Sequence, residues 1–207
     1  IGSTTEICQF VEQEYKLTKQ ILSILNDHGI SYTILTKSHL IAEYADLINK
    51  HPNNTIFFTL NCVDNDLIRS LEPTSPSVEQ RLQCISHLVN NNVSVRIHCG
   101  PFFPFISDTE EIIKILPQGI TEIDIEMYHH EMGNFDAIVK LLGKMYGNDI
   151  KNKFIAVYQS EENYLFGKTV IQQVVKREPD IYFAFFDNGF GDLLAMKDKS
   201  CNDDYIY

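Results

Sequence analysis

The segment 55–99, TIFFTLNCVDNDLIRSLEPTSPSVEQRLQCISHLVNNNVSVRIHC, decides the fold of this chain. Its first six residues, TIFFTL (55–60), form a nearly continuous apolar run that predicts a buried β-strand. The apolar residues of VEQRLQCISHLVNN (78–91) recur at helical spacing, at Val78, Leu82, Ile85 and Leu88. The β-branched run VSVRIHC (93–99) predicts a second strand. A strand, a helix and a strand in this order predict two parallel strands joined by a crossover helix.

The same alternation continues in both directions from this unit. Helices are predicted over 15–29, 38–50, 109–116 and 135–147, and further strands over 30–36 and 120–128. The helix at 15–29 places Leu17, Ile21, Ile24 and Leu25 on one face. After residue 152 the pattern weakens: 154–177 predicts a short strand or loop followed by a helix, and 181–188 predicts a strand.

Repeated alternation of strands and helices predicts an α/β protein with a parallel sheet and flanking helices. Two architectures fit: an open doubly wound sheet and a barrel. The loops after the strands, TKS, NCVDN and GPFFPFISD, carry no glycine-rich phosphate-binding motif, which disfavours a doubly wound nucleotide-binding sheet. We therefore predict a partial (β/α)6 TIM-like barrel over residues 1–152. Residues 153–207 either complete this barrel or form an appended segment.

Composition excludes several classes of protein. The 207 residues are 44% hydrophobic, typical of a globular domain, and the net charge of −11 disfavours a general nucleic-acid binder. We see neither a signal peptide nor an apolar run of the roughly 18 residues that span a membrane. The five cysteines are too scattered for a zinc ribbon or a disulfide framework, so we expect packed thiols and a cytoplasmic location.

The proline-rich loop SLEPTSPSVEQRL (70–82) lies between an apolar segment and the helix at 78–91. Ser77 and Gln80 have the spacing of a capping box, which would start that helix. Glu72 and Arg81 are candidates for an ion pair that fixes the loop beneath the strand ends. A loop built only as a rigid helix start would also explain the pattern.

Polar residues stand where the predicted strands end, and a parallel barrel gathers such ends at one face. Lys37 follows the strand at 30–36. Thr59 and Asn61 end the next strand and share a face on strict alternation. His98 shares a face with Arg96, which indicates polar groups directed into the barrel.

Four segments together resemble the radical S-adenosylmethionine (SAM) superfamily, in particular the branch that contains spore photoproduct lyase. They are GSTTEICQFVEQEYKLT (2–18), ILTKSHLI (34–41), LEPTSPSVEQRL (71–82) and GPFFPFISD (100–108). Each motif alone is weak, but their order and spacing are moderately specific. The resemblance covers residues 1 to about 115.

This resemblance implies an enzyme that cleaves SAM reductively with a 4Fe–4S cluster to start radical chemistry. It implies that Ser3 and Thr4 lie near the SAM amino group and Lys37 near a charged end. It further implies that Thr59 and Asn61 lie near the ribose, with His98 in the same pocket. It assigns no catalytic residue and no protein-bound metal besides the cluster.

The sequence departs from the family at one motif. Family members hold three irons of the cluster through C-x-x-x-C-x-x-C and leave the fourth iron to SAM. No such motif occurs in this chain. It would lie before Ile1, so we interpret the chain as a fragment of a radical SAM enzyme. We expect the fragment to bind no cluster and to be inactive alone.

Other functions remain open at this point. One alternative is a cluster-free barrel relative that binds a ligand or a partner. A metal-dependent hydrolase using Glu72, Glu126 and the histidines ranks last, because those carboxylates have no metal-ligand spacing. Adjacent histidines in a strand, as in YHHE (128–131), would point in opposite directions and could not easily bind one metal ion. The expected partner is a small-molecule cofactor. Nucleic acid enters only by family analogy, and an open sheet edge favours self-association.

Overall fold

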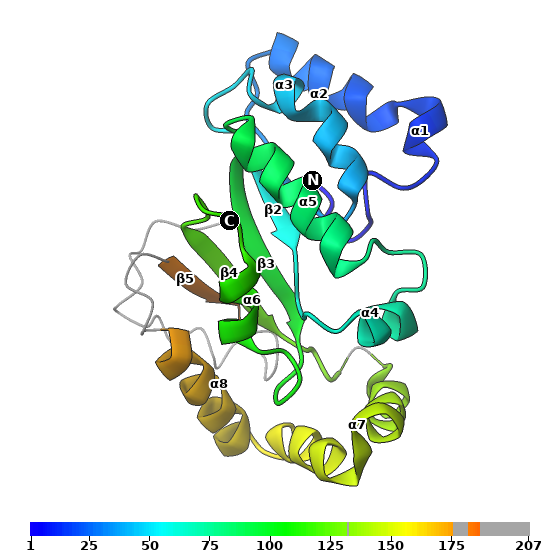
Figure 1. Ribbon diagram of the computed structural model, residues 1–207, viewed down its shortest axis with the longest axis vertical. Helices are drawn as coiled ribbons and strands as arrows, with labels where there is room; N and C mark the ends of the chain where they lie inside the picture. The colour runs from blue at the N-terminus through cyan, green and yellow to red at the C-terminus, as the bar shows by residue number, and fades with distance from the viewer. Residues whose placement is uncertain (132, 176–181, 187–207) are drawn as a thin grey trace.

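The computed structural model describes residues 1–131, 133–175 and 182–186, and these residues contain one parallel sheet. Its five strands lie side by side in the order in which they occur along the chain (Figure 1). They are β1 (Thr33–Thr36), β2 (Thr55–Thr59), β3 (Ser94–Phe102), β4 (Glu122–Met127) and β5 (Tyr182–Phe186). All four neighbouring pairs are parallel.

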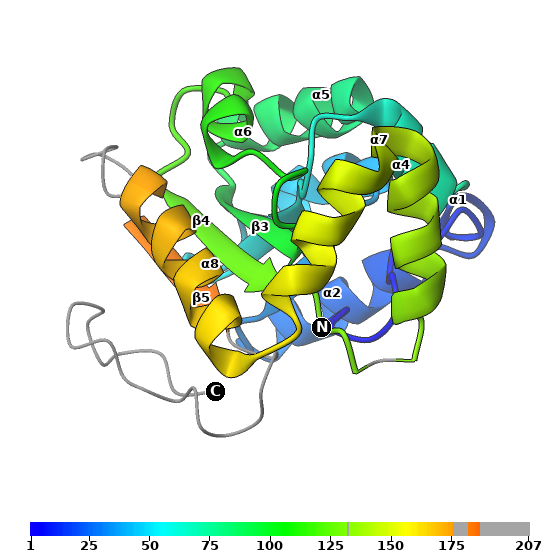
Figure 2. The ribbon, with the colours of Figure 1, turned by 90° about the horizontal axis from the view of Figure 1, so that it is seen from below.

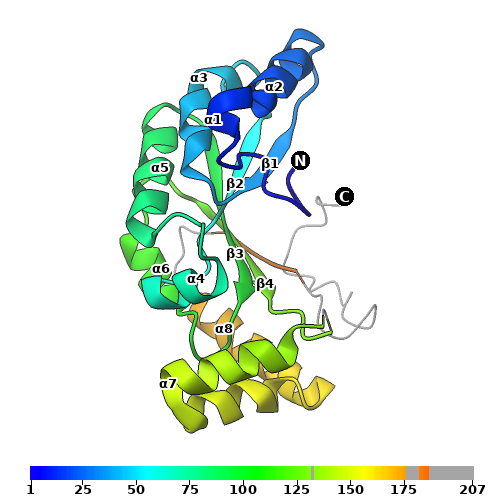
Figure 3. The ribbon, with the colours of Figure 1, turned by 90° about the vertical axis from the view of Figure 1, so that its right-hand side faces the viewer.

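Helices connect these strands. They are α1 (Glu12–Tyr15), α2 (Leu17–Asp27), the 3-10 helix η1 (His39–Tyr44), α3 (Ala45–Ile48), α4 (Asn65–Leu71), α5 (Val78–Asn90), α6 (Thr109–Ile115), α7 (Phe135–Val157) and α8 (Glu161–Val175). Figure 3 shows α3, α5 and α6 on one side of the sheet, with α7 beyond the strand ends to which the arrows point in Figure 1. Viewed from that end, α7 and α8 lie across the near side of the molecule (Figure 2).

The predicted α/β class with a parallel sheet and flanking helices is confirmed. Sequential strand order means that every crossover advances to the next strand in the same direction, as in a partial TIM-like barrel. α7 spans the position at which we divided the chain, and β5 pairs with β4. The separate status of residues 153–207 stays a prediction, and most of 181–207 lies outside the described residues.

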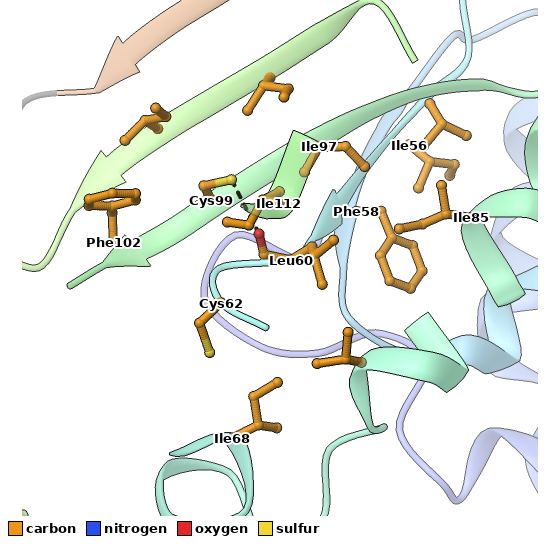
Figure 4. Packing of buried hydrophobic residues seen from close by; sticks show 14 of the residues in the cluster. Ile56, Phe58, Leu60, Cys62, Ile68, Ile85, Ile97, Cys99, Phe102 and Ile112 are labelled. Atoms are coloured by element: carbon orange, nitrogen blue, oxygen red, sulfur yellow. Dashed lines mark hydrogen bonds between the residues drawn. The ribbon is translucent and has the colours of Figure 1, made fainter. Parts of the chain in front are cut away.

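The core lies between the sheet and the helix layer. Alternate residues of β2 and β3 point into it, and Ile56, Phe58 and Ile97 are fully buried there against Ile85 of α5 (Figure 4). The intervening residues, such as Thr59 and His98, therefore occupy the opposite, concave face of the sheet. The alternation that builds the core thus also presents polar groups on the other face.

Local capping explains where two of the helices begin. The Ser77 hydroxyl accepts a hydrogen bond from the backbone N–H of Gln80, and the Gln80 side chain accepts one from the backbone of Ser77. This confirms the predicted capping box. The Asp108 carboxylate accepts the backbone N–H groups of Glu110 and Glu111 and starts α6.

Helix α2 differs from what its periodicity suggests. Leu17, Ile21 and Ile24 share one face, and an apolar face normally turns toward the core. In the structure these side chains are 58%, 49% and 57% exposed. Leu22 and Thr18 are the buried residues of the helix instead. The described residues therefore cover only part of the apolar surface of α2.

Two further segments correct the sequence analysis. Residues 154–157 are not a strand or loop: they lie in the part of α7 that follows a break at Gly147, where the predicted helix 135–147 ends, and Phe154 and Val157 pack one helical turn apart into the core. Sequence reasoning also missed α4, which Asp64 caps by accepting the N–H groups of Asp66 and Leu67. Within the described ranges, we find no helix that is both long and apolar enough to cross a membrane.

Candidate functional site

A cavity of about 530 Å³ lies where β1 to β4 end, on the concave face of the sheet. Five of the six residues that the sequence singled out for a cofactor line this one cavity: Ser3, Thr4, Lys37, Thr59 and His98. Residues that the sequence did not assign to a cofactor also line it, among them Glu6, Glu126, Tyr128, His129 and Asn134. Its volume is within the ordinary range for a small-molecule site.

Asn61, the sixth residue, does not line the cavity. It is buried, and its amide donates a hydrogen bond to the Pro101 carbonyl at 3.3 Å. Its side-chain oxygen is buried and has no hydrogen-bond partner within the part of the chain that the structure describes. Alternation placed Asn61 on the face of Thr59, but β2 ends at Thr59, so strand geometry no longer directs the next side chains.

The segment before α1 forms one wall of the cavity. Gly2 has φ of 91°, and a Cβ atom there would lie 2.3 Å from the Leu35 carbonyl oxygen, so the close approach requires glycine. The Glu6 carboxylate then holds the end of β1: it accepts the Thr36 hydroxyl at 2.6 Å and the Lys37 backbone N–H at 2.9 Å. These contacts fix Ser3 and Thr4 beside β1.

The Glu72 carboxylate joins two cations under the cavity. It pairs with the fully buried Arg81 at 2.9 Å, which confirms the predicted ion pair, and with the Lys37 ammonium. Arg81 also donates to the carbonyls of Pro76 at 3.0 Å and Thr59 at 3.3 Å. These contacts hold the proline-rich loop in place and connect the start of α5 to the end of β2.

This network decides the charge of Glu72. Burial alone would raise the pKa of the Glu72 carboxyl, but Lys37 and Arg81 outweigh burial and lower it. Glu72 is thus a carboxylate at neutral pH, and the Lys37 charge at the cavity is partly neutralised. Any anionic group bound in the cavity would compete with Glu72 for Lys37.

Two contacts between charged or ionisable side chains join β3 and β4 on the concave face. Arg96 forms an ion pair with Glu122 at 2.9 Å and lies over the Phe57 ring, and the Nε2 atom of His98 lies 3.3 Å from the Glu126 carboxylate. Arg96 and His98 share this face, as alternation predicted. The His98 ring packs against Gly100, where a Cβ would lie 2.2 Å from its Nε2 atom.

Asp124 lies between these pairs and was missed by the sequence analysis. It is in register with His98, only 3% exposed, and its Oδ2 atom has no hydrogen-bond partner among the described residues. Burial raises the pKa of Asp124 to about 6, and His98 and Arg96 offset part of that rise. The signal was available: Glu122, Asp124 and Glu126 recur at every second position of β4.

An aromatic wall closes the cavity beyond β4. The Tyr128 hydroxyl donates to the Asn134 side chain at 2.5 Å, and its ring stacks on Phe103. His129 lines the cavity, whereas His130 packs against Phe135 and Tyr158. The adjacent histidines therefore have different surroundings, but both follow the end of β4 at Met127, so strand alternation is not the cause.

The described cysteines are not grouped. Cys8, Cys62, Cys84 and Cys99 are buried separately, and burial raises the pKa of each thiol, to about 12 for Cys8 and Cys84. Such thiols stay protonated at neutral pH, whereas cluster ligands are thiolates. These four residues do not fit an iron–sulfur cluster, and no three metal-ligating side chains are grouped in the described part of the chain.

A larger, mostly apolar cavity of about 690 Å³ lies between the loop after β3 and helices α7 and α8. It contains none of the residues that the sequence assigned to a cofactor. Convergent polar side chains at the ends of four parallel strands distinguish the smaller cavity, so we take that one as the candidate site.

Comparison with known proteins yields two curated relatives. An uncharacterised protein of Methanocaldococcus jannaschii, MJ0683, is 30% identical over 137 residues, which are 66% of this chain and 51% of the relative. ORF301 of Acidianus two-tailed virus, also uncharacterised, is 24% identical over 142 residues, 64% of this chain and 47% of the relative. The chain thus spans about half the length of these relatives. No family model matches.

Among solved structures, the chain is similar to SuiB of Streptococcus suis, crystallised with S-adenosylmethionine. The TM-score is 0.51 at 16% identity, covering 82% of this chain and 36% of SuiB. At this identity the likeness shows a shared fold. The chain is therefore an α/β protein that shares its fold with part of SuiB.

Proposed function

We propose that this chain is the SAM-binding part of a radical SAM enzyme similar to the spore photoproduct lyase branch. In this proposal the cluster-binding cysteines lie on a β/α unit that precedes Ile1. The intact enzyme would cleave SAM reductively to start radical chemistry, and the present chain would be inactive alone. Its substrate is not specified by the residues described here.

One observation carries the proposal. Residues that the family resemblance assigns to SAM, far apart in sequence, line a single cavity at the carboxyl ends of parallel strands. Family motifs and three-dimensional position thus agree independently, in a fold shared with a protein crystallised with SAM. If the cavity had another function, its lining would match the residues that the family resemblance assigns to SAM only by chance.

The chemistry of the cavity fits SAM in part. The Thr59 hydroxyl suits a ribose hydroxyl, and the Ser3 and Thr4 hydroxyls suit a polar group at the opposite wall. Lys37 would orient the carboxylate while Glu72 limits its net charge. When a cluster is present, it supplies the electron for SAM cleavage. The described thiols of this chain do not fit that cluster, so we assign no step through it.

A calorimetric titration of SAM into the 207-residue chain tests the site. Without the cluster, SAM lacks its anchor to iron, so we expect a dissociation constant on the order of 1 mM, about −4 kcal/mol. Thr59→Val should weaken binding further, whereas Thr55→Val, at the other end of β2, should leave it unchanged. Micromolar binding that survives both Lys37→Ala and Thr59→Val, which change two residues that line the cavity, would refute the site.

The alternative is a cluster-free barrel that binds a ligand or a partner. It is favoured by the contacts between β3 and β4 on the concave face, which need no radical chemistry. Reading the gene upstream of Ile1 separates the two. A preceding C-x-x-x-C-x-x-C motif supports the enzyme, and an upstream sequence without it supports the binding module. The metal hydrolase is disfavoured because Lys37 and Arg81 already engage Glu72.

Location and partners belong to the same proposal. The separately buried free thiols suit the reducing cytoplasm. The proposed ligand is a small-molecule cofactor, and nucleic acid enters only through analogy with the lyase. The net charge of −11 gives that analogy no support.

A further inference from the structure

Helix α2 carries an apolar stripe that the described residues leave uncovered. Leu17, Ile21 and Ile24 follow the i, i+4, i+7 spacing of one helical face and are each about half exposed. Tyr15, at the end of α1, is 58% exposed as well. Single exposed apolar residues are ordinary, but a continuous stripe along a helix indicates a contact surface. We call these four residues the α2 stripe.

The position of α2 narrows what covers this stripe. Helix α2 packs against α3, and α5 packs against η1, so these elements form one layer over the sheet. Figure 3 shows α2 at one end of that layer, near the first strand of the sheet, β1. Its inner side is covered, since Leu22 is fully buried and Leu25 packs on the core. The stripe lies on the part of α2 that the core does not cover.

The backbone of Ile1 forms two hydrogen bonds with the edge of β1. Its amino group donates to the Thr33 carbonyl at 2.7 Å, and its carbonyl accepts the Leu35 N–H at 2.9 Å. These two bonds reach the residues on either side of Ile34, which is the hydrogen-bond pattern of a parallel strand pair. Ile1 thus occupies the edge of β1 as the last residue of a parallel strand would. Gly2 then turns the chain away from the sheet.

The connection from Ile1 to β1 through α2 then has the form of a crossover. Helix α5 makes the equivalent connection from β2 to β3, and its Ile85 and Leu88 are fully buried over the two strands that it joins. By the same geometry, α2 should cover β1 together with the strand that ends at Ile1. Only the β1 side of that pair is present beneath it.

We propose that the α2 stripe is covered by the β/α unit that precedes Ile1 in the same polypeptide. The strand that ends at Ile1 would extend the edge of β1, and the helix that precedes this strand would pack beside α2 as α3 does on the other side. The inference rests on the proposed function, which places the cluster motif on that unit. What it adds is that the α2 stripe is a packing surface, and this claim does not depend on whether the unit binds iron.

The test compares the 207-residue chain with the natural chain extended upstream by one β/α unit, about 30 residues. Ile21→Lys introduces a charge in the stripe, and Ile115→Lys is the matched control on α6, where Ile115 is 38% exposed. In the short chain we expect both variants to melt within about 1 °C of the parent. In the extended chain, Ile21→Lys should lower the melting temperature by several degrees, while Ile115→Lys stays near the parent.

If the extended Ile21→Lys chain fails to fold, Ile21→Ala replaces it, with an expected decrease of about 4 °C or more in the extended chain alone. Equal melting of parent and stripe variants in the extended chain would overturn the inference. So would a dimer of the extended chain, detected by light scattering, that Ile21→Lys dissociates, because a second copy would then be the partner.

The iron content of the extended chain separates the two proposals. A stripe that becomes sensitive to Ile21→Lys in a chain that binds no iron would support the packing surface and refute the radical SAM function. Iron bound by an extended chain that tolerates Ile21→Lys would refute the packing surface and leave the function standing.

Discussion

Helices α2 and α5 look alike in sequence but differ in the structure. Both have apolar residues at helical spacing, and both precede a strand of the same parallel sheet. In α5 the residues Ile85 and Leu88 are fully buried. In α2 the corresponding stripe through Ile21 is half exposed. Periodicity therefore defines which side of a helix is apolar, whereas the neighbouring strands decide whether that side is covered.

The two helices also start differently. Helix α5 begins with a local capping box, whereas α2 follows Lys16, whose φ is 51°, and takes its cap from a distant carboxylate. The Glu12 carboxylate accepts the N–H groups of Thr18 and Lys19 and the Tyr44 hydroxyl. One helix is thus defined by its own sequence, and the other by its surroundings.

The largest loss of stability should come from removing the partner of Arg81, the buried charge on α5. Glu72→Ala removes the main anionic partner of the fully buried Arg81, so we expect the free energy of unfolding to fall by about 3–5 kcal/mol. Lys37→Ala removes the more exposed cation of the same network and should cost less than about 1 kcal/mol. Urea denaturation measures both. Equal losses would show that Arg81 does not depend on Glu72.

The apolar faces give the next largest effect. Ile85→Ala creates a cavity under α5 and should cost about 2–4 kcal/mol. Ile21→Ala, the same substitution on the exposed stripe of α2, should change the stability of the 207-residue chain by no more than about 0.5 kcal/mol. A large loss from Ile21→Ala in this chain would mean that the stripe is already packed in solution.

These differences explain how far the sequence could predict the fold. The order of strands and helices, the capping box at Ser77 and the pairing of Glu72 with Arg81 depend on residues close in sequence or on simple periodicity. The exposure of Ile21 depends on what lies beside β1, which no local pattern encodes. Helix α4 was missed for a different reason: its seven residues carry too short a pattern to identify a helix.

The candidate site likewise contains residues that the sequence could predict and residues that it could not. Lys37, Thr59 and His98 could be predicted because strand ends in a parallel sheet meet at one face. Asn61 was misplaced because alternation was extended past the end of β2. Asp124 was missed because its significance lies in burial with an Oδ2 atom that no described residue hydrogen-bonds, which is a property of the packed sheet and not of the residue type.

The start of α2 should make its stability depend on pH. Burial would raise the pKa of Glu12, but hydrogen bonds from Thr18, Tyr44 and Lys19 outweigh it and lower the pKa below its ordinary value. The ionised carboxylate therefore stabilises the fold above about pH 4.5, and this contribution is lost as the pH falls through the lowered pKa. Glu12→Gln should cost about 2 kcal/mol at pH 7.

The measurement for Glu12 is the free energy of unfolding as a function of pH. The difference between parent and Glu12→Gln should narrow as the pH falls through the lowered pKa of Glu12, where the parent loses the charge. Glu14→Gln, an exposed neighbour on the same helix, serves as the control and should run parallel to the parent. A difference that is constant with pH would mean that the Glu12 charge does not hold α2.

The smallest effect should come from the local cap of α5. Ser77→Ala removes the hydroxyl that accepts the Gln80 N–H and should cost about 1 kcal/mol, because the backbone of the capping box can still be solvated at this exposed position. Ser77→Asp should retain most of the parent's stability, since its carboxylate can accept the same bond. If Ser77→Ala cost as much as Glu12→Gln, a local cap and a distant one would contribute alike. The start of α5 would then depend on its surroundings as much as the start of α2 does.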